Sequence, residues 1–528
     1  MRTCRRPFRF CLSLGVLAVS TAASAEDPGM RPSLGLSPFA PQGVPALPGG
    51  VTPAFGAPVA PDNWQFDFHG YMQAPLRAGI STRESPTPDQ HGVQLHTPPL
   101  VPGEYGYFDY TGTVPQPWVQ LNFTYGNGRV AATAIVAAWR ASEDMLAAAN
   151  FEPASQVGIN NAFMTYTPEA MGPVKLQLKF GVYPDRYGSM AEYDEGRYGT
   201  AVIGKIFGVG ETLTADFELG RNVDLELEHG VKGHFDKPPV GLVQDNSNSF
   251  ARPEQGATYA HHAHAGVSYN EIARIGLHYI ESFSRDDRAQ KLVRPLDDPN
   301  TPVDESRQAS YEPLPDGDLR VLGAELTVRS SFGRFYLGAS RARLDHTESL
   351  SDLVQVLNTG GGYNFMQRLI GLASRGTASL FIVGSEYSMS FGKLTHPAGE
   401  FWGEGADVLV SLFGMYDRMS SDDPAYDGVR SYKFGAEATL SALPWLAVSS
   451  RIDRLVPDDR SSGRSFTVVS PKLVFRTNWQ TREAVTLQYA KWFYGSAPVY
   501  EGDRVGLMNN PGQKLDDQMV AIYASMWW

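Results

Sequence analysis

The sequence predicts an all-β protein, a closed antiparallel transmembrane β-barrel of about 18 strands in an outer membrane. Three observations predict it: an export signal at the N-terminus, no cysteine beyond that signal, and strand after strand in which apolar and polar residues alternate. A period of two with charged residues on the polar face is expected where one face of each strand meets lipid and the other meets water.

Residues 1–25 form the export signal. Arginines open the chain, an apolar stretch follows, and Ala23-Ser24-Ala25 is a small-x-small cleavage site. We therefore expect cleavage after Ala25 and export through the general secretory route to the outer membrane. Both cysteines, Cys4 and Cys11, lie inside this signal, so the mature chain should contain no disulfide.

Composition excludes several other classes of protein. The chain has 45 Lys and Arg against 57 Asp and Glu, and four of the basic residues lie in the signal. The net charge of −16 that remains argues against a nucleic-acid partner. The longest apolar run beyond the signal, 130–139, is too short for a transmembrane helix. No catalytic motif stands out, so we expect neither an enzyme nor a cofactor.

The chain beyond the signal divides into two parts. Residues 26–62 should be a flexible periplasmic arm, because 28–61 contain nine prolines and a single charged residue. Residues 63–528 should form the barrel. We expect strands near 64–74, 117–125, 129–140, 158–167, 173–182, 211–219, 222–230, 257–268, 272–282, 318–330, 333–345, 376–391, 405–417, 430–441, 444–456, 463–477, 483–494 and 516–528.

The connections between these strands alternate in length. Tight turns such as Gly126-Asn127-Gly128 and Ser331-Phe332-Gly333 separate long loops such as 75–116, 231–256 and 283–317. This asymmetry is typical of short periplasmic turns and long external loops. An even number of strands also leaves both chain ends in the periplasm, which agrees with an arm at the start.

Segments at both ends of the barrel resemble the maltoporin (sugar porin) family. Phe66-Asp67-Phe68-His69-Gly70-Tyr71 is similar to that family's opening strand, Tyr489-Ala490-Lys491-Trp492 to its penultimate strand, and Met526-Trp527-Trp528 to its last residues. Phe413-Gly414-Met415-Tyr416-Asp417 is a weaker match between them. The resemblance implies an 18-stranded homotrimer that passes maltodextrins, with outer-membrane lipid and oligosaccharide solutes as its partners.

The family lines its channel with six aromatic residues along which sugar rings slide. The resemblance places this line on Tyr71, Trp118, Phe151, Phe332, Trp479 and Trp527. Alternation supports three of them, because Tyr71, Trp118 and Trp527 fall on the polar face of their strands. An aromatic ring can stack on the C–H face of a pyranose while the sugar hydroxyls keep polar partners. The alternative is a girdle of aromatic residues at the membrane interface.

The third external loop, near 183–210, is the one that narrows the channel in the family. The resemblance implies a constriction formed by Arg186, Glu192, Tyr193, Asp194 and Tyr198, with Gln73 and Gln120 on the wall. At these last two positions the family has Arg and Glu, so this chain departs from the pattern that sets its substrate. The alternative is an ordinary solvated loop.

Three further interpretations stay open. A porin of other selectivity with an acidic lumen would prefer neutral or cationic solutes. A plugged barrel would bind a partner or serve a structural role, and a barrel enzyme would need a paired nucleophile and base. His261, His262 and His264 form a cluster, but alternation places His261 on the other face, so we expect no metal site.

Overall fold

The structure is a computed structural model, and it describes most of the predicted barrel. The described residues are 64–81, 118–139, 157–169, 172–186, 205–220, 222–233, 259–270, 272–284, 290–293, 310–313, 315–347, 350, 372–373, 376–395, 406–424, 426–456, 458–460, 465–478, 483–494 and 517–527. The signal and the Pro-rich arm that the sequence predicts lie outside them.

Twenty strands and one short helix make up the described chain. The strands that form the main sheet are β1 (Gln65–Ser81), β2 (Trp118–Gly126), β3 (Val130–Trp139), β4 (Val157–Tyr166), β5 (Val174–Arg186), β6 (Lys205–Glu218), β7 (Val223–Gly233), β8 (Tyr259–Tyr269), β9 (Ala273–Ser284), β12 (Gly317–Arg329), β13 (Gly333–Asp345), β14 (Thr377–Ser390), β15 (Asp407–Ser421), β16 (Arg430–Leu443), β17 (Leu446–Val456), β18 (Phe466–Phe475), β19 (Ala484–Tyr494) and β20 (Asp517–Trp527). The hairpin β10 (Gln290–Val293) and β11 (Ser310–Pro313) and the helix α5 (Phe391–Thr395) complete the set.

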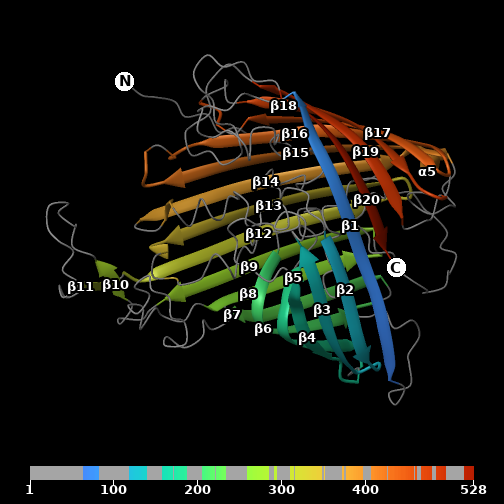
Figure 1. Cartoon of the computed structure of the whole chain (residues 1–528). Helices are drawn as coiled ribbons and strands as arrows, with labels where there is room; N and C mark the ends of the chain where they lie inside the picture. The colour runs from blue at the N-terminus through green and yellow to red at the C-terminus, as the bar shows by residue number, and fades with distance from the viewer. Residues whose placement is uncertain are drawn as a thin grey trace, which may run out of the picture.

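The 18-stranded sheet closes on itself. Each strand pairs antiparallel with the strand before it and the strand after it, and β9 passes directly to β12. β1 pairs with β2 on one side and with β20 on the other, so no strand of the sheet keeps a free edge. Figure 1 shows the blue β1 beside the dark red β20, where the first and last strands of the sheet meet. The fold is therefore a closed antiparallel barrel, as the sequence predicts.

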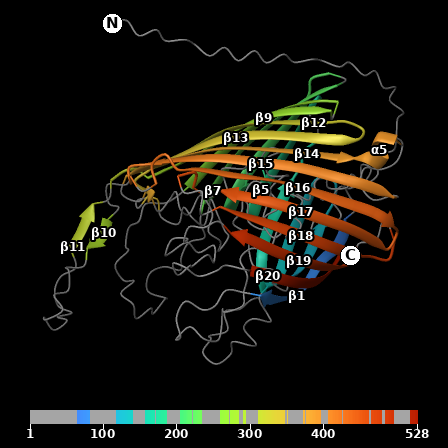
Figure 2. The ribbon, with the colours of Figure 1, turned by 90° about the horizontal axis from the view of Figure 1, so that it is seen from above.

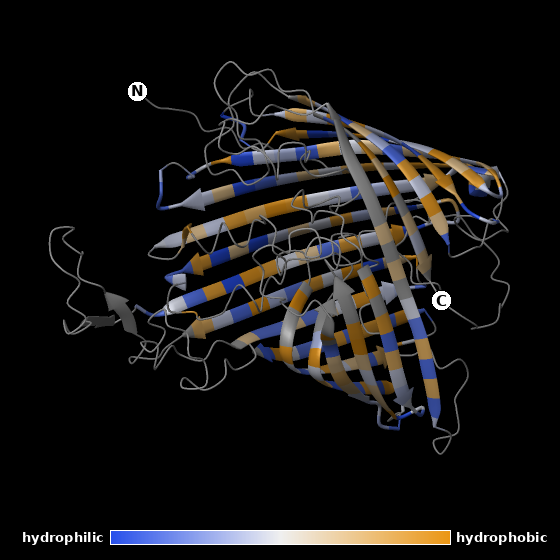
Figure 3. Cartoon of the chain, in the orientation of Figure 1, coloured by the Kyte–Doolittle hydropathy of each residue, from blue (hydrophilic) through white to orange (hydrophobic). Residues whose placement is uncertain are grey.

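The polarity of the wall is the reverse of that in a soluble protein. Large apolar side chains are exposed on the outer face of strand after strand, among them Phe66, Met164, Leu213, Leu322, Leu412, Phe434 and Val485. Polar and charged side chains on the alternate positions are buried, among them Asn122, Thr212, Glu325, Lys433 and Arg451. Figure 3 shows this alternation as orange and blue bands along single strands. The outer face suits lipid and the inner face suits water.

The two ends of the barrel differ in their connections. At one end β2 and β3, β6 and β7, β12 and β13, and β16 and β17 are joined by only a few residues. At the other end 82–117, 140–156, 234–258 and 285–316 separate consecutive strands of the sheet. We call the first the short-turn end, which the sequence analysis expects to face the periplasm, and the second the long-loop end, which it expects to face outward.

Side chains at the short-turn end form hydrogen bonds to backbone N–H groups of the same turn. The Asn127 carboxamide oxygen accepts from the N–H groups of Arg129 and Val130, both at 2.9 Å. Asn270 and Gly172 take positive φ angles of 47° and 66°, which these residue types tolerate. Ser390, the last residue of β14, caps the N-terminus of α5, since its hydroxyl accepts from the Lys393 N–H at 3.0 Å.

The structure also differs from the predicted strands in detail. The hairpin β10–β11 interrupts what the sequence predicts as one long loop, and Figure 2 shows it lying apart from the barrel wall. Several strands run beyond their predicted limits, and β1 continues to Ser81. Within the described residues, no helix has the length and apolar character needed to cross a membrane.

A charge on the outer face should destabilise the barrel. Leu412 lies outward on β15 with 51% of its surface exposed. Leu412→Arg should lower the free energy of unfolding by about 2–4 kcal/mol, because an arginine near the middle of the bilayer loses its hydration. Urea titration of the barrel refolded in phosphatidylcholine vesicles measures this. Leu412→Met is the matched control, and equal stability of the two variants would contradict a lipid-facing position.

Candidate functional site

The inner wall carries a belt of buried polar side chains that extends over much of the length of the strands. The members named here are buried and come from 13 of the 18 strands of the sheet. They include Asn122, Thr124, Thr133, Asn161, Thr165, Thr212, His262, His264, His278, Glu325, Thr327, Ser340, Glu386, Ser388, Glu437, Thr439, Ser449, Arg451, Asp453, Ser470, Lys472, Thr486 and Gln488. This belt is the candidate path for a polar solute.

On one side of the belt, strands β16 to β18 hold a buried ionic network. Lys472 Nζ lies 2.6 Å from Glu437 Oε1, and both side chains are almost wholly buried. The Arg451 guanidinium binds both oxygens of Asp453, at 2.8 and 2.9 Å. Bidentate pairing of this kind fixes the plane of the guanidinium as well as its position. The four charges therefore compensate each other inside the wall.

Neutral groups complete the partners of this network. The Ser449 hydroxyl donates to Glu437 at 3.1 Å, and Thr439 donates to Ser449 at 2.8 Å. The Arg451 guanidinium carbon also lies 4.7 Å from the centre of the Phe413 ring, a cation–π distance. Removal of one member would leave a buried charge without its partner, which is more costly than the pair is stabilising.

On the other side of the belt, β7 to β12 hold a cluster of histidines and carboxylates. His264 lies between two carboxylates, with Nδ1 3.3 Å from Glu226 Oε1 and Nε2 3.5 Å from Glu325 Oε1. Arg274 Nη2 also approaches Glu226 Oε1, at 2.8 Å. One imidazole therefore links β7 to β12 across two intervening strands.

Glycines make room for these rings. A Cβ atom placed on Gly323 would overlap the His278 ring, and one placed on Gly230 would overlap the His262 ring. One placed on Gly276 would come within 3 Å of both Glu325 and His264. The polar side chains thus lie flat against the wall, over strand backbone that carries no side chain of its own.

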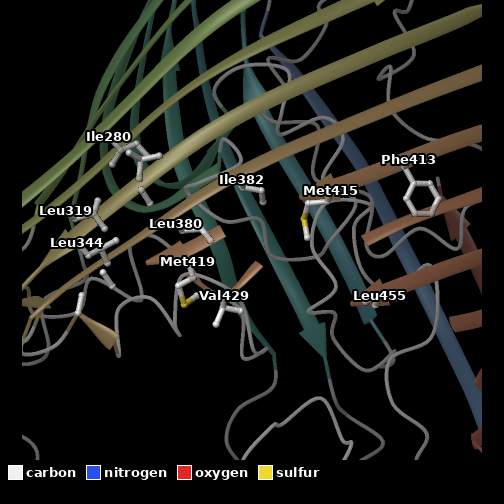
Figure 4. Packing of buried hydrophobic residues seen from close by; sticks show 14 of the residues in the cluster. Ile280, Leu319, Leu344, Leu380, Ile382, Phe413, Met415, Met419, Val429 and Leu455 are labelled. Carbon is white, nitrogen blue, oxygen red and sulfur yellow. The ribbon is translucent and has the colours of Figure 1, made fainter. Parts of the chain in front are cut away.

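Toward the long-loop end, the inner wall of β12 to β19 becomes apolar. A buried cluster there includes Leu319, Val321, Leu344, Leu380, Ile382, Met415, Met419, Leu455, Phe466, Val468 and Trp492. Leu350 and Ala373, from the connection between β13 and β14, belong to the same cluster. Figure 4 shows Leu344, Leu380, Met419 and Val429 near one another. Both described ends of that connection therefore pack against the wall.

Strand register brings three of the predicted aromatic positions together. Residue Tyr71 on β1 pairs with Trp527 on β20 and with Gln120 on β2. Two residues further along β1, on the same face, Gln73 pairs with Trp118. Three aromatic positions and the two glutamine positions thus occupy two consecutive rows where the barrel closes.

Phe332 is not part of this group. It lies in the short turn between β12 and β13, about half of the sheet away from β1, and the Ser390 N–H donates to its carbonyl at 2.8 Å. Arg186 is the last residue of β5 and pairs with Lys205, so it lies on a strand rather than in the predicted loop. The remaining predicted positions, Phe151, Trp479, Glu192, Tyr193, Asp194 and Tyr198, lie outside the described residues.

The histidines of β8 divide as alternation predicts. His262 and His264 are buried on the inner face, and His261 lies on the outer face, where its ring stacks on Phe283. Among the described residues, no group of three or more His, Cys, Asp or Glu side chains is placed to hold a metal ion.

These features define the class of protein: a transmembrane β-barrel of the outer-membrane type with a polar interior. No model of a known protein family matches the chain, and neither does any curated protein. Among solved structures the chain is similar to OccK1 (OpdK) of Pseudomonas aeruginosa, with 10% identity and a TM-score of 0.42 over 88% of this chain and 99% of that one. It is also similar to OccK11 (OpdR) of the same organism, with 9% identity and a TM-score of 0.38 over 88% and 95% of the two chains.

A third similar structure is OmpT, an outer membrane protein of Vibrio cholerae, solved in a trimer form. Its identity is 8% and its TM-score is 0.37, over 88% of this chain and 100% of that one. Similarity at this level says nothing about the solute or the assembly of this chain. The assignment to the class of transmembrane β-barrels follows from the closed sheet and from the reversed polarity of its wall.

The buried pair of Lys472 and Glu437 should be strongly coupled. Lys472→Met leaves a buried carboxylate without its cation and should cost about 3–5 kcal/mol of unfolding free energy. Adding Glu437→Gln should recover part of that loss, a coupling of about 0.5–3 kcal/mol. Urea unfolding of the two single variants and the double variant measures it.

The matched control is an exposed pair with the same geometry. Lys175 Nζ also lies 2.6 Å from Glu218 Oε1, but both side chains are more than half exposed. Its double-mutant cycle should show little coupling. Similar coupling in the two cycles would contradict the burial of the Lys472 pair.

Gly323 should not tolerate a side chain. Gly323→Ala places a methyl group on the His278 ring and should cost about 1–3 kcal/mol. Gly414→Ala is the control, because its nearest neighbouring atom would be 3.8 Å away. Adding His278→Ala to Gly323→Ala should restore part of the stability. Thermal unfolding that ranks Gly323→Ala level with Gly414→Ala would contradict this packing.

Proposed function

We propose that the protein is a porin, a passive channel for small hydrophilic solutes across the outer membrane. The observation that supports this most is the closed barrel with a charged and hydroxyl-rich inner wall inside an apolar outer face. These side chains lie on the face of the wall that is turned away from the exposed apolar side chains, and their hydroxyl, amide and charged groups are the kinds of group that bind a hydrophilic solute. A passive channel also needs no catalytic group.

We propose further that the solutes are oligosaccharides of the maltodextrin type. This finer proposal rests on the resemblance to the sugar porins and on the two rows that hold positions 71, 527 and 118. Neighbouring aromatic rings would offer a sugar several similar weak sites, so that each step along the path exchanges like contacts. In this proposal three chains assemble as in that family.

The charge of the buried wall favours uncharged solutes. On the described strands its buried cations are Lys232, Lys433, Arg451 and Lys472, and its buried anions are Glu325, Glu386, Asp417, Glu437 and Asp453. Nearly equal numbers of the two signs, with several direct ion pairs, leave little net potential to attract ions of one sign. The net charge of the whole chain is therefore a poor guide to its selectivity.

A plugged barrel is the second candidate, and one observation favours it. The apolar inner wall of β12 to β19 is buried and packs with Leu350 and Ala373 from a connection at the long-loop end. Because other residues cover this part of the inner wall, the path left for a solute through the barrel is narrower. A barrel of this kind would bind a partner or stiffen the membrane instead of conducting.

Single-channel recording in planar bilayers distinguishes these proposals. Maltodextrins added to one side should block the wild-type current reversibly, and Trp118→Ala and Trp527→Ala should each weaken the block by about fivefold. The control is Trp445→Ala, since Trp445 lies exposed in the turn between β16 and β17. Current that no sugar alters would leave a porin of other selectivity, and the absence of current would favour the plugged barrel.

A further inference from the structure

A row of arginines lies on the outer face of the barrel. On each of these strands, outward-facing positions alternate with buried ones. The outward-facing positions include Arg320, Arg341, Arg343, Arg418, Arg430 and Arg454. All six lie within four residues of the long-loop end of their strands, on consecutive strands from β12 to β17 except β14. Five of them are exposed, and Arg454 is half-buried.

The short-turn end carries no such row. Outward positions there hold aromatic and aliphatic side chains such as Tyr125, Tyr166, Tyr269, Phe475 and Val485. In the described strands, arginines on the outward parity occur only toward the long-loop end. The arrangement is therefore specific to the outer leaflet of the membrane.

Register sets like charges opposite each other in this row. Arg320 pairs directly with Arg343, and Arg418 pairs directly with Arg430. Like charges in directly opposed positions destabilise a sheet unless anions neutralise them. Carboxylates of the chain serve some members: Arg320 Nη2 lies 2.9 Å from Asp318 Oδ2, and Arg343 Nε lies 3.2 Å from Asp345 Oδ2.

Three members of the row have no carboxylate partner among the described residues. One of them, Arg454, donates to the hydroxyl groups of Thr467 and Ser465. Arg341 and Arg418 flank Phe381 in one row of paired residues, and no carboxylate of the described residues forms a salt bridge with either. Arg418 acts on one carboxyl beyond the end of its strand, that of Asp427. The Ser420 hydroxyl, the Ser421 N–H and, more weakly, the Arg418 guanidinium lower the pKa of that carboxyl.

Aromatic residues place this row at the level of the lipid head groups. Phe381 between the two arginines is exposed, and Tyr416 and Tyr432, two positions closer to the middle of the membrane, lie with ring centres 5.4 Å apart. Tyrosines gather where hydrocarbon gives way to head groups, and arginines just beyond them can extend into the polar layer.

We propose that Arg341 and Arg418 bind the phosphate groups of a lipid head group in the outer leaflet. A guanidinium offers a phosphate two parallel N–H donors, which an ammonium cannot match. The two arginines stand two strand spacings apart, roughly 10 Å, so a head group with two phosphates can span them. Phe381 between them packs against the lipid chains. This site is independent of the proposed solute path.

Native mass spectrometry of the purified barrel in detergent tests the proposal, with diphosphoryl lipid A as the probe. The double variant Arg341→Gln/Arg418→Gln should lose about tenfold or more in affinity for this lipid. The control variant is Arg129→Gln/Lys175→Gln, which removes two exposed cations at the short-turn end. It should bind the lipid as the wild type does, and the fully dephosphorylated lipid should bind weakly to all three proteins.

Three results would overturn the proposal. The first is a double variant that binds lipid A as tightly as the wild type. The second is an equal loss in the control variant, which would indicate general charge attraction. The third is a change in oligomeric state of the double variant with unchanged lipid binding, which would make the row an interface between copies of this chain.

Discussion

The barrel depends on the pairing of every strand on both sides. Hydrocarbon offers no hydrogen-bond partner, so a backbone N–H or C=O group left at a free edge would cost several kcal/mol. The ladder between β1 and β20 removes the last edge, and it joins residues at opposite ends of the chain. Once the sheet closes, each residue faces either lipid or interior, and the reversed polarity of the wall follows from that constraint.

The same constraint explains how much of the fold the sequence predicts. Each strand of the barrel alternates because lipid lies on one side, and all 18 predicted strands correspond to strands of the closed sheet. Apolar and polar residues alternate where one face of a strand contacts lipid, so this pattern is not expected in segments outside the membrane. The hairpin β10–β11 lies apart from the barrel wall, so alternation does not predict it. The strand β1 continues past its predicted end at 74, through Pro75 to Ser81, in register with β20.

The candidate site is less predictable, because alternation gives the face of a residue but not its neighbour. Trp527 and Tyr71 are 456 positions apart in the sequence, and only closure of the barrel with a particular stagger makes them partners. Lys472 and Glu437 each fall on the polar parity, but their contact depends on the register of two strand pairs. The balance of buried charge has the same origin, and the net charge of the chain does not reveal it.

The measurement that tests the account most directly is a spin-label scan of β15. Single cysteines at 408–417, each carrying a nitroxide, report collision with oxygen, which concentrates in lipid. The account predicts oxygen accessibility with a period of two, highest at the outward positions Val408, Val410, Leu412, Gly414 and Tyr416. The opposite phase, or accessibility without this period, would contradict a barrel whose outer face meets lipid and whose inner face is polar.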